Sequence, residues 1–209
     1  MIRATLFGLT LMMASASFAL SAGQKLDLDL SGDNHPATGA PNAAITMIEF
    51  SDFECPNCRR LEPTLIELRK SYGDRIRFVW MDFPLPSHRH ALTAAVAARC
   101  AREQNQFWPY HDALMSGRES LGEGNLTDLA DRLGLDPGNF RLCLAQRKYQ
   151  GVVESDIDAG DAIGLSGTPS LVINGSLYNG NFSAADLKAA IDTASVSKAT
   201  QGDVNGHQH

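Results

Sequence analysis

The sequence predicts an α/β fold in which a helical block separates a β-α-β unit from a β-β-α unit. An apolar, β-branched run at 45–50 (ITMIEF) is followed by a helical pattern, and 75–83 (RIRFVWMDF) alternates as a strand does. Residues 87–164 carry helical patterns and no strand pattern. Strand character returns at 170–173, and Asn174 with the glycine after it is a strong hairpin signal. The two halves each lack a full sheet, so we expect them to pair with one another.

Five helices are expected in the helical block, because apolar residues recur there at helical spacing. Their ranges are 88–104, 107–115, 126–133, 137–147 and 149–164. After the hairpin, Ser183 is a suitable cap for a last helix over 184–194. The chain therefore divides into a signal peptide (1–22), an exposed N-terminal segment (23–44), a domain made of 45–86 and 165–195, a helical insertion (87–164) and a disordered tail (196–209).

The first residues have the pattern of a secretory signal peptide. Arg3 is followed by an apolar run at 4–13 and then by small residues. Cleavage is expected after Ala19, with Ala22 as the alternative. The apolar run is shorter than the roughly 20 residues that span a membrane. We therefore expect an exported protein in a compartment that permits disulfides, the periplasm first and the extracellular space as the alternative.

Composition excludes one large class of function. The net charge is −6, and the sequence contains no stretch rich in Lys and Arg. A nucleic-acid interface needs such a stripe, so we expect no nucleic-acid binding.

The main chemical motif is Cys55-Pro56-Asn57-Cys58, which directly follows a predicted strand and opens a predicted helix. Pro56 suits the first helical position. A helix N-terminus carries partial positive charge and free N–H groups, and both stabilise a thiolate. We therefore predict that Cys55, at the exposed end, is the attacking sulfur and that Cys58 is its redox partner.

These residues and their surroundings resemble the DsbA-like branch of the thioredoxin superfamily, a group of exported thiol–disulfide oxidoreductases. The resembling segments are 40–61 (APNAAITMIEFSDFECPNCRRL), 83–88 (FPLPSH), 95–100 (AVAARC), 107–114 (FWPYHDAL) and 167–173 (GTPSLVI). The resemblance implies a thioredoxin-like fold with an all-helical insertion, and no cofactor. It also implies that Glu49 is the buried acid beneath the active site.

Glu49 has an argument of its own, because it lies in an otherwise apolar strand six residues before Cys55. A carboxyl buried there has a raised pKa and can exchange a proton with Cys58, directly or through water. The alternative is that Glu49 points outward or makes a structural hydrogen bond.

The resemblance further implies a substrate-binding surface of Pro56, Asn57, Thr168 and Pro169. Pro169 resembles the cis-proline that lies against the cysteine pair, and Thr168 resembles the residue whose backbone pairs with an extended substrate segment. Asn57 departs from strongly oxidising relatives, which often carry His at this position. We therefore expect a milder oxidant than the strongest members of the family.

Cys100 and Cys143 form a second pair in the helical block, and we expect a structural disulfide between them. Two buried free thiols or an accessory redox pair are the alternatives. A zinc site at the Cys-x-x-Cys motif would need two further ligands, for which His88 and His90 are available. The helix-opening proline and the exported context argue against zinc, so we expect no metal.

The favoured function is oxidation of cysteine pairs in exported proteins, with reoxidation by a DsbB-like membrane protein as the family implies. A disulfide isomerase or reductase is the first alternative. The best-known exported ones dimerise through an added N-terminal domain, for which too few residues precede the fold. Thr168 keeps this alternative open, because isomerase-like relatives often have Thr there. A non-enzymatic binding module is the second alternative, and we expect a monomer.

Overall fold

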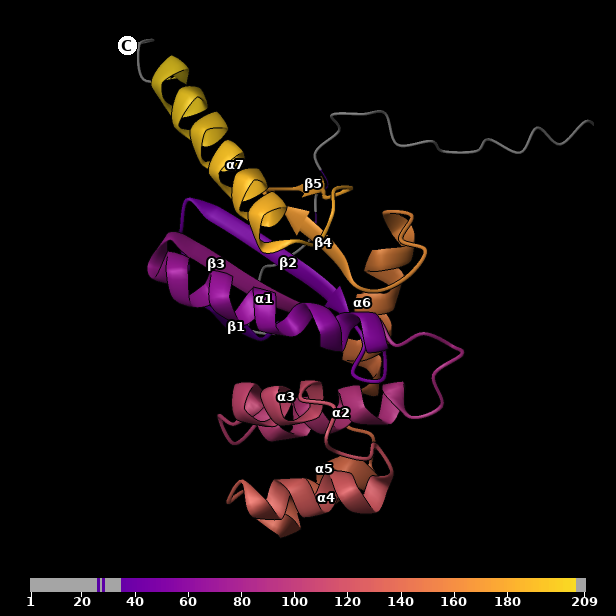
Figure 1. The fold of residues 1–209 in the computed structure, drawn as a ribbon. Helices are drawn as coiled ribbons and strands as arrows, with labels where there is room; N and C mark the ends of the chain where they lie inside the picture. Colours follow the sequence, from indigo (N-terminus) through magenta and orange to yellow (C-terminus); the bar gives the residue numbers. More distant parts are fainter. Residues whose placement is uncertain (1–25, 27, 29–34, 206–209) are drawn as a thin grey trace, which may run out of the picture.

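A computed structural model of the chain describes residues 26, 28 and 35–205. Figure 1 shows a central sheet with helices on both faces and, below it in this view, a separate layer that holds α2 to α5. The strands are β1 (Ala37–Thr38), β2 (Ile45–Ser51), β3 (Ile76–Asp82), β4 (Ser170–Ile173) and β5 (Ser176–Leu177). The helices are α1 (Pro56–Tyr72), a 3-10 turn (Gly73–Arg75), α2 (Ala91–Arg102), α3 (Phe107–Met115), α4 (Glu123–Arg132), α5 (Pro137–Ala145), α6 (Gln150–Ala162) and α7 (Ala184–Asn205). The predicted α/β fold with a helical insertion is confirmed.

The sheet has the order β1-β3-β2-β4-β5. β2 and β3 run parallel and are joined by α1, whereas β4 runs antiparallel to β2. This pairing is the one expected of two incomplete halves, because the β-α-β unit and the β-β-α unit share β2 as the central strand. The Cys-x-x-Cys motif therefore follows the strand in the middle of the sheet.

Side chains alternate between the two faces of the sheet, and different helices cover each face. Met47, Phe78 and Leu171 point to the face covered by α1 and α7. Ile48 and Val79 point to the opposite face, where α6 packs. Both clusters are buried, so the central strands are apolar on both sides.

A buried ion cluster joins the insertion to the sheet. Arg99 on α2 donates from Nε to Asp82 Oδ2 at 2.7 Å and from Nη2 to Asp156 Oδ2 on α6 at 2.5 Å. Asp156 also accepts from the backbone N–H of Asp82 at 2.9 Å. All three side chains are 1% exposed. Because the charges have no access to solvent, they fix α2 and α6 against the end of β3.

Two predictions at the ends of the fold are wrong. The segment 23–44 is not simply exposed, since β1 pairs with the edge of β3 and Pro36 and Ala43 are buried. A two-residue edge strand has no alternating pattern to announce it. The last helix also continues past Ala194 to Asn205, although residues 196–209 were expected to be disordered. No proline or glycine interrupts the chain between Ala194 and residue 201, so nothing in the sequence ends the helix earlier.

Other expectations concern residues that the structure does not place. The signal peptide at 1–22 and residues 206–209 lie outside the described residues. Within the described part of the chain, no helix combines the length and the apolar character needed to cross a membrane.

Candidate active site

The two cysteines of the motif lie at the start of α1. Cys55 is the N-cap residue with extended backbone angles, and Pro56 is the first helical residue. Both cysteines are unpaired in this structure, with exposed fractions of 3% for Cys55 and 0% for Cys58. The first turn of α1 contains no acidic residue to offset the helix dipole. Cys55 is therefore the slightly more exposed of the two cysteines, at the positive end of a long helix.

Asn57 and its neighbour Arg60 form an exposed polar cap over this turn. Arg60 Nη2 donates to Asn57 Oδ1. The sequence analysis did not anticipate this pair, although the spacing of three residues within a helix is the usual signal for such a contact.

Thr168 and Pro169 lie beside the cysteine pair, although Thr168 follows Cys55 by 113 residues in the sequence. The Thr168–Pro169 peptide bond is cis, as the resemblance implies. The Cys55 thiol donates to the carbonyl oxygen of Thr168, with Sγ and oxygen 3.5 Å apart. The fold thus places the loop before β4 directly beside Cys55.

Glu49 lies on β2 beneath the motif, and its side chain is 0% exposed. Neither of its carboxyl oxygens has a hydrogen-bond partner among the described residues. Burial, assisted by the negative charge of Glu62 and opposed by Arg69, raises the pKa of Glu49 to about 8. The alternative that Glu49 points outward is wrong, and Ser51 on the same strand opposes the rise in the pKa of Glu49.

Cys58 and Glu49 influence each other's protonation. Burial, together with the nearby charge of Glu49, raises the pKa of the Cys58 thiol far above its ordinary value. At neutral pH both groups therefore hold their protons when the cysteines are reduced.

Asp52 organises the loop that leads to Cys55, a role that the sequence analysis missed. Its backbone oxygen accepts from the N–H of Cys55 at 3.1 Å, and Oδ1 accepts from the N–H of Glu54 at 2.7 Å. Oδ2 accepts from the N–H of Leu85 at 2.8 Å and lies 2.6 Å from Nδ1 of His88. The segment FPLPSH is thereby held against the active-site loop.

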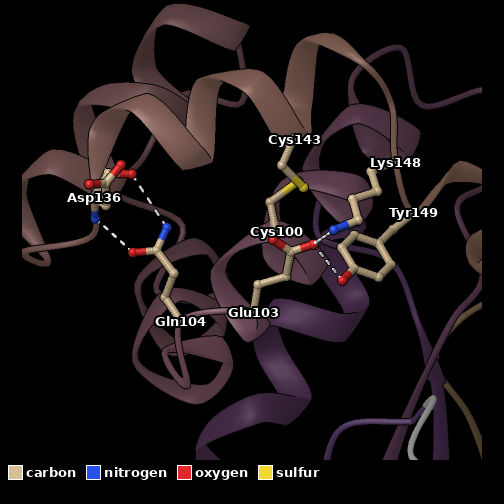
Figure 2. The surroundings of a disulfide bond; sticks show 7 residues. All are labelled: Cys100, Glu103, Gln104, Asp136, Cys143, Lys148 and Tyr149. Carbon is tan, nitrogen blue, oxygen red and sulfur yellow. Dashed lines mark hydrogen bonds and ion pairs between the residues drawn. A yellow bond between two sulfur atoms is a disulfide. The ribbon is translucent and has the colours of Figure 1, made fainter.

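Cys100 and Cys143 are joined by a disulfide that connects α2 to α5, with Cα atoms 5.9 Å apart (Figure 2). Both residues are buried. Around the bond, Glu103 accepts from the hydroxyl of Tyr149 at 2.6 Å and pairs with Lys148. The bond lies between two packed helices of the insertion, which is where a structural disulfide was expected.

The structure also shows where metal-type donors gather. Within the described residues, the set of three such donors is Glu62, His111 and Asp112, and it includes neither cysteine of the motif. The guanidinium of Arg69 lies 2.6 Å from Glu62 and 4.0 Å from Asp112, so a positive charge already balances these acids. This arrangement is that of an ion cluster rather than of a metal site.

Comparison with known proteins identifies the family. A family model described as Thioredoxin (Thioredoxin_4) matches residues 31–193, which is more than half of the chain. The chain belongs to this thioredoxin family. Its Cys-x-x-Cys pair lies at the start of α1, where a helix N-terminus can act on a sulfur.

Solved structures of DsbA-like and thioredoxin-like proteins share this fold. A thioredoxin-like oxidoreductase from Silicibacter pomeroyi has a TM-score of 0.71 at 28% identity, covering 78% of this chain and 93% of that chain. BdbD from Bacillus subtilis has a TM-score of 0.69 at 23% identity, with coverage of 78% and 93%. The α-DsbA1 protein from Wolbachia pipientis has a TM-score of 0.69 at 22% identity, with coverage of 84% and 96%.

The curated relatives are longer proteins. A Na⁺/H⁺ antiporter NhaA 3 of Salinispora tropica is 39% identical over 166 residues, which are 79% of this chain and 25% of the antiporter. A Na⁺/H⁺ antiporter NhaA 1 of Salinispora arenicola is 37% identical over 163 residues, 78% of this chain and 25% of the antiporter. The chain thus spans about a quarter of the length of these relatives.

Proposed function

We propose that the chain is a dithiol oxidase that passes its Cys55–Cys58 disulfide to cysteine pairs of exported proteins. A substrate thiolate attacks Cys55 Sγ, the Cys55–Cys58 bond breaks, and Cys58 leaves with the electron pair and takes a proton from Glu49. A second substrate thiolate then attacks the substrate sulfur of the mixed disulfide. The substrate leaves with a disulfide, and Cys55 leaves as a thiolate. Two electrons thus move from the substrate dithiol to the enzyme.

The observation that carries this direction is the environment of Cys55 in the reduced state. The sulfur sits at the N-terminus of a helix whose first turn lacks acids. The positive end of a helix dipole favours negative charge, and a stable reduced form makes the corresponding disulfide a good oxidant. Asn57 itself carries no charge, so the effect is smaller than that of a protonated His.

The substrate-binding role proposed for Pro56, Asn57, Thr168 and Pro169 is supported by their position around Cys55. Pro56 and Asn57 are exposed, and the Thr168 carbonyl lies beside the thiol. An extended peptide that pairs with the backbone at Thr168 would bring its own cysteine to Cys55.

Export, the partners and the oligomeric state belong to the proposal as well. The Cys100–Cys143 disulfide supports an oxidising compartment, and the apolar N-terminal run supports export to the periplasm. We propose a monomer that acts on substrate proteins and is reoxidised by a DsbB-like membrane protein. A disulfide isomerase or reductase is the second candidate, favoured by the presence of Thr before the cis-proline. The antiporter names of the curated relatives do not enter the proposal, because it rests on the cysteine pair.

The reduction potential of the Cys55–Cys58 couple tests the direction. The protein would be equilibrated in glutathione buffers, with Cys100 and Cys143 followed separately by alkylation and mass analysis. We expect a potential above about −270 mV, the value for thioredoxin, and below about −120 mV, the value for DsbA. A potential near that of thioredoxin would reject the oxidase in favour of the reductase or isomerase. A Cys58→Ser variant should accumulate a mixed disulfide on Cys55, and a variant that exchanges disulfides normally without Cys55 would reject the enzyme altogether.

A further inference from the structure

A second group of polar side chains, partly buried, extends from α1 to the surface. Glu49 lies opposite Trp80 in the β2–β3 register, and the rings of Trp80 and His111 have centroids 4.5 Å apart. Glu62 on α1 is buried, and its charge acts on Glu49. His111 on α3 is 0% exposed, whereas its neighbour Asp112 is 51% exposed. One ring nitrogen of His111, one oxygen of Glu62 and one oxygen of Asp112 lie within 4.8 Å of one another. Glu62, His111 and Asp112 thus make a polar series that runs from a buried position on α1 to solvent.

The hydrogen bonds along this series leave inward-facing atoms unpaired. His111 Nδ1 lies 2.9 Å from Asp112 Oδ1, while Nε2 of the same ring is buried without a partner among the described residues. Glu62 Oε1 accepts from Arg69 at 2.6 Å, and Glu62 Oε2 is also buried and unpaired. Buried polar atoms without protein partners are the usual neighbours of ordered water. A ring with one nitrogen bonded toward the surface and the other facing inward can transfer protons between the two sides.

The chemistry of the cysteine pair requires such a path. In the reduced enzyme, Glu49 and Cys58 both hold protons at neutral pH. Cys58 must lose its proton before it can attack the mixed disulfide on Cys55, and Glu49 can accept that proton only after releasing its own. Both side chains are 0% exposed, so the released proton cannot pass directly to solvent.

We propose that Glu62 and the His111–Asp112 pair form the path by which the proton of Glu49 leaves and re-enters the active site. This inference rests on the proposed exchange at Cys55–Cys58 and extends it to residues that never touch the substrate. The groups that face the path are Glu49 on β2, Glu62, Arg69 and Lys70 on α1, and Asp112 on α3. His111 acts through Glu49, so its role is that of a positioning residue.

A purely structural role for His111 is the competing explanation. Its ring packs against Trp80 with centroids 4.5 Å apart and against Trp108 at 5.2 Å, as core aromatic residues do. The resulting cage accounts for the burial of the ring. It does not account for a buried, unpaired Nε2 on a ring that lies beside the buried Glu62.

The experiment follows oxidation of the reduced protein by oxidised glutathione between pH 6 and pH 9, with acid quenching and mass analysis. Cys55 attacks glutathione disulfide and releases one glutathione thiolate. Cys58 then loses its proton, attacks Cys55 and releases the second thiolate. For His111→Gln and Asp112→Asn we expect the second step to be about ten-fold slower at pH 7. This is less than the roughly 10²–10⁴-fold effect of a direct general acid or base, because these residues act through Glu49. The difference from wild type should close above about pH 8, where Glu49 has already lost its proton.

The controls separate the possible failures. Tyr110→Phe removes a buried hydroxyl from the same helix. This hydroxyl donates to the carbonyl oxygen of Leu126 at 2.8 Å and takes no part in the path, so the variant should keep the wild-type rate at every pH. Asp112→Glu should restore the rate that Asp112→Asn loses. A rate ratio that is constant across pH, or equal to one, would overturn the path. A wild-type protein that forms no Cys55–Cys58 disulfide would instead overturn the proposed function. Asp112 is half exposed, so its variants decide the matter even where His111→Gln does not fold.

Discussion

Replacement of Glu49 by Gln should make the reduced protein more stable, and the gain should grow with pH. The folded-state pKa of this carboxyl is about 8, against an ordinary value of 4.5. A carboxyl with a raised folded pKa keeps its proton in the folded state and loses it in the unfolded state. It therefore leaves stability unaffected below pH 4.5 and lowers it progressively as the pH rises from 4.5 to 8.

The magnitude follows from the two pKa values. Linkage gives a penalty of about 1 kcal/mol at pH 5 and about 3 kcal/mol at pH 7 for the ionisable side chain. Gln cannot ionise and has nearly the same shape, so the variant should escape this penalty. Both the amide and the protonated carboxyl lack hydrogen-bond partners, and their desolvation should largely cancel in the comparison.

Denaturant unfolding of the reduced protein at pH 5, 6 and 7, with both sulfurs of the motif kept as thiols, measures the effect. The same variant should oxidise more slowly with glutathione disulfide, because Cys58 has lost its proton acceptor. A stability difference that does not change between pH 5 and pH 7 would refute the assignment of Glu49 as a buried acid with a raised pKa.

Two further predictions concern packing away from the motif. Replacing Cys100 and Cys143 together by Ala should lower the free energy of unfolding by about 4 kcal/mol in the chain-entropy model. The reduction potential of the Cys55–Cys58 pair should stay unchanged. A shifted potential would show that the second pair takes part in the redox chemistry. On α6, a Cβ at Gly160 would lie 2.5 Å from the ring of Phe83, so Gly160→Ala should destabilise the protein by about 1–3 kcal/mol. A Cβ at Gly151 on the same helix would meet nothing within 4 Å, so Gly151→Ala should stabilise the protein by up to about 1 kcal/mol. Thermal unfolding of the two glycine variants checks the pair, and equal effects would contradict the packing of α6 described above.

The parts of the fold that could be predicted are those with a strong local pattern. The apolar strand before Cys55 and the helix after Cys58 are visible in the sequence because each has its own periodicity and a proline marks the start of the helix. β1 could not be predicted, because its two residues are a strand only through pairing with β3. The end of α7 was missed because polar residues without a breaker can continue a helix as well as form a tail.

The site divides in the same way. The cysteine pair and Glu49 are close in sequence, so strand and helix patterns were enough to place them together. The contact of Asp52 with His88 and the approach of His111 to Glu62 join residues that are distant in the chain. Side-chain pairs of this kind depend on how the insertion packs on the sheet, which periodicity does not determine. Thr168 and Pro169 were placed only through the family resemblance.

The buried acid and the second disulfide have comparable and opposite effects on stability. The raised pKa of Glu49 lowers the free energy of unfolding by about 3 kcal/mol at pH 7, where the side chain is protonated in the folded protein and ionised in the unfolded one. The bond between Cys100 and Cys143 raises it by about 4 kcal/mol. A small domain has only about 5–15 kcal/mol of net stability, so the loss of stability caused by this buried acid is a large fraction of the total. Because α2 and α5 are covalently joined, the insertion can hold α3, and with it His111 and Asp112, against the sheet while Glu49 changes its charge during the reaction. The helical insertion thus contributes stability to the same site whose chemistry reduces it.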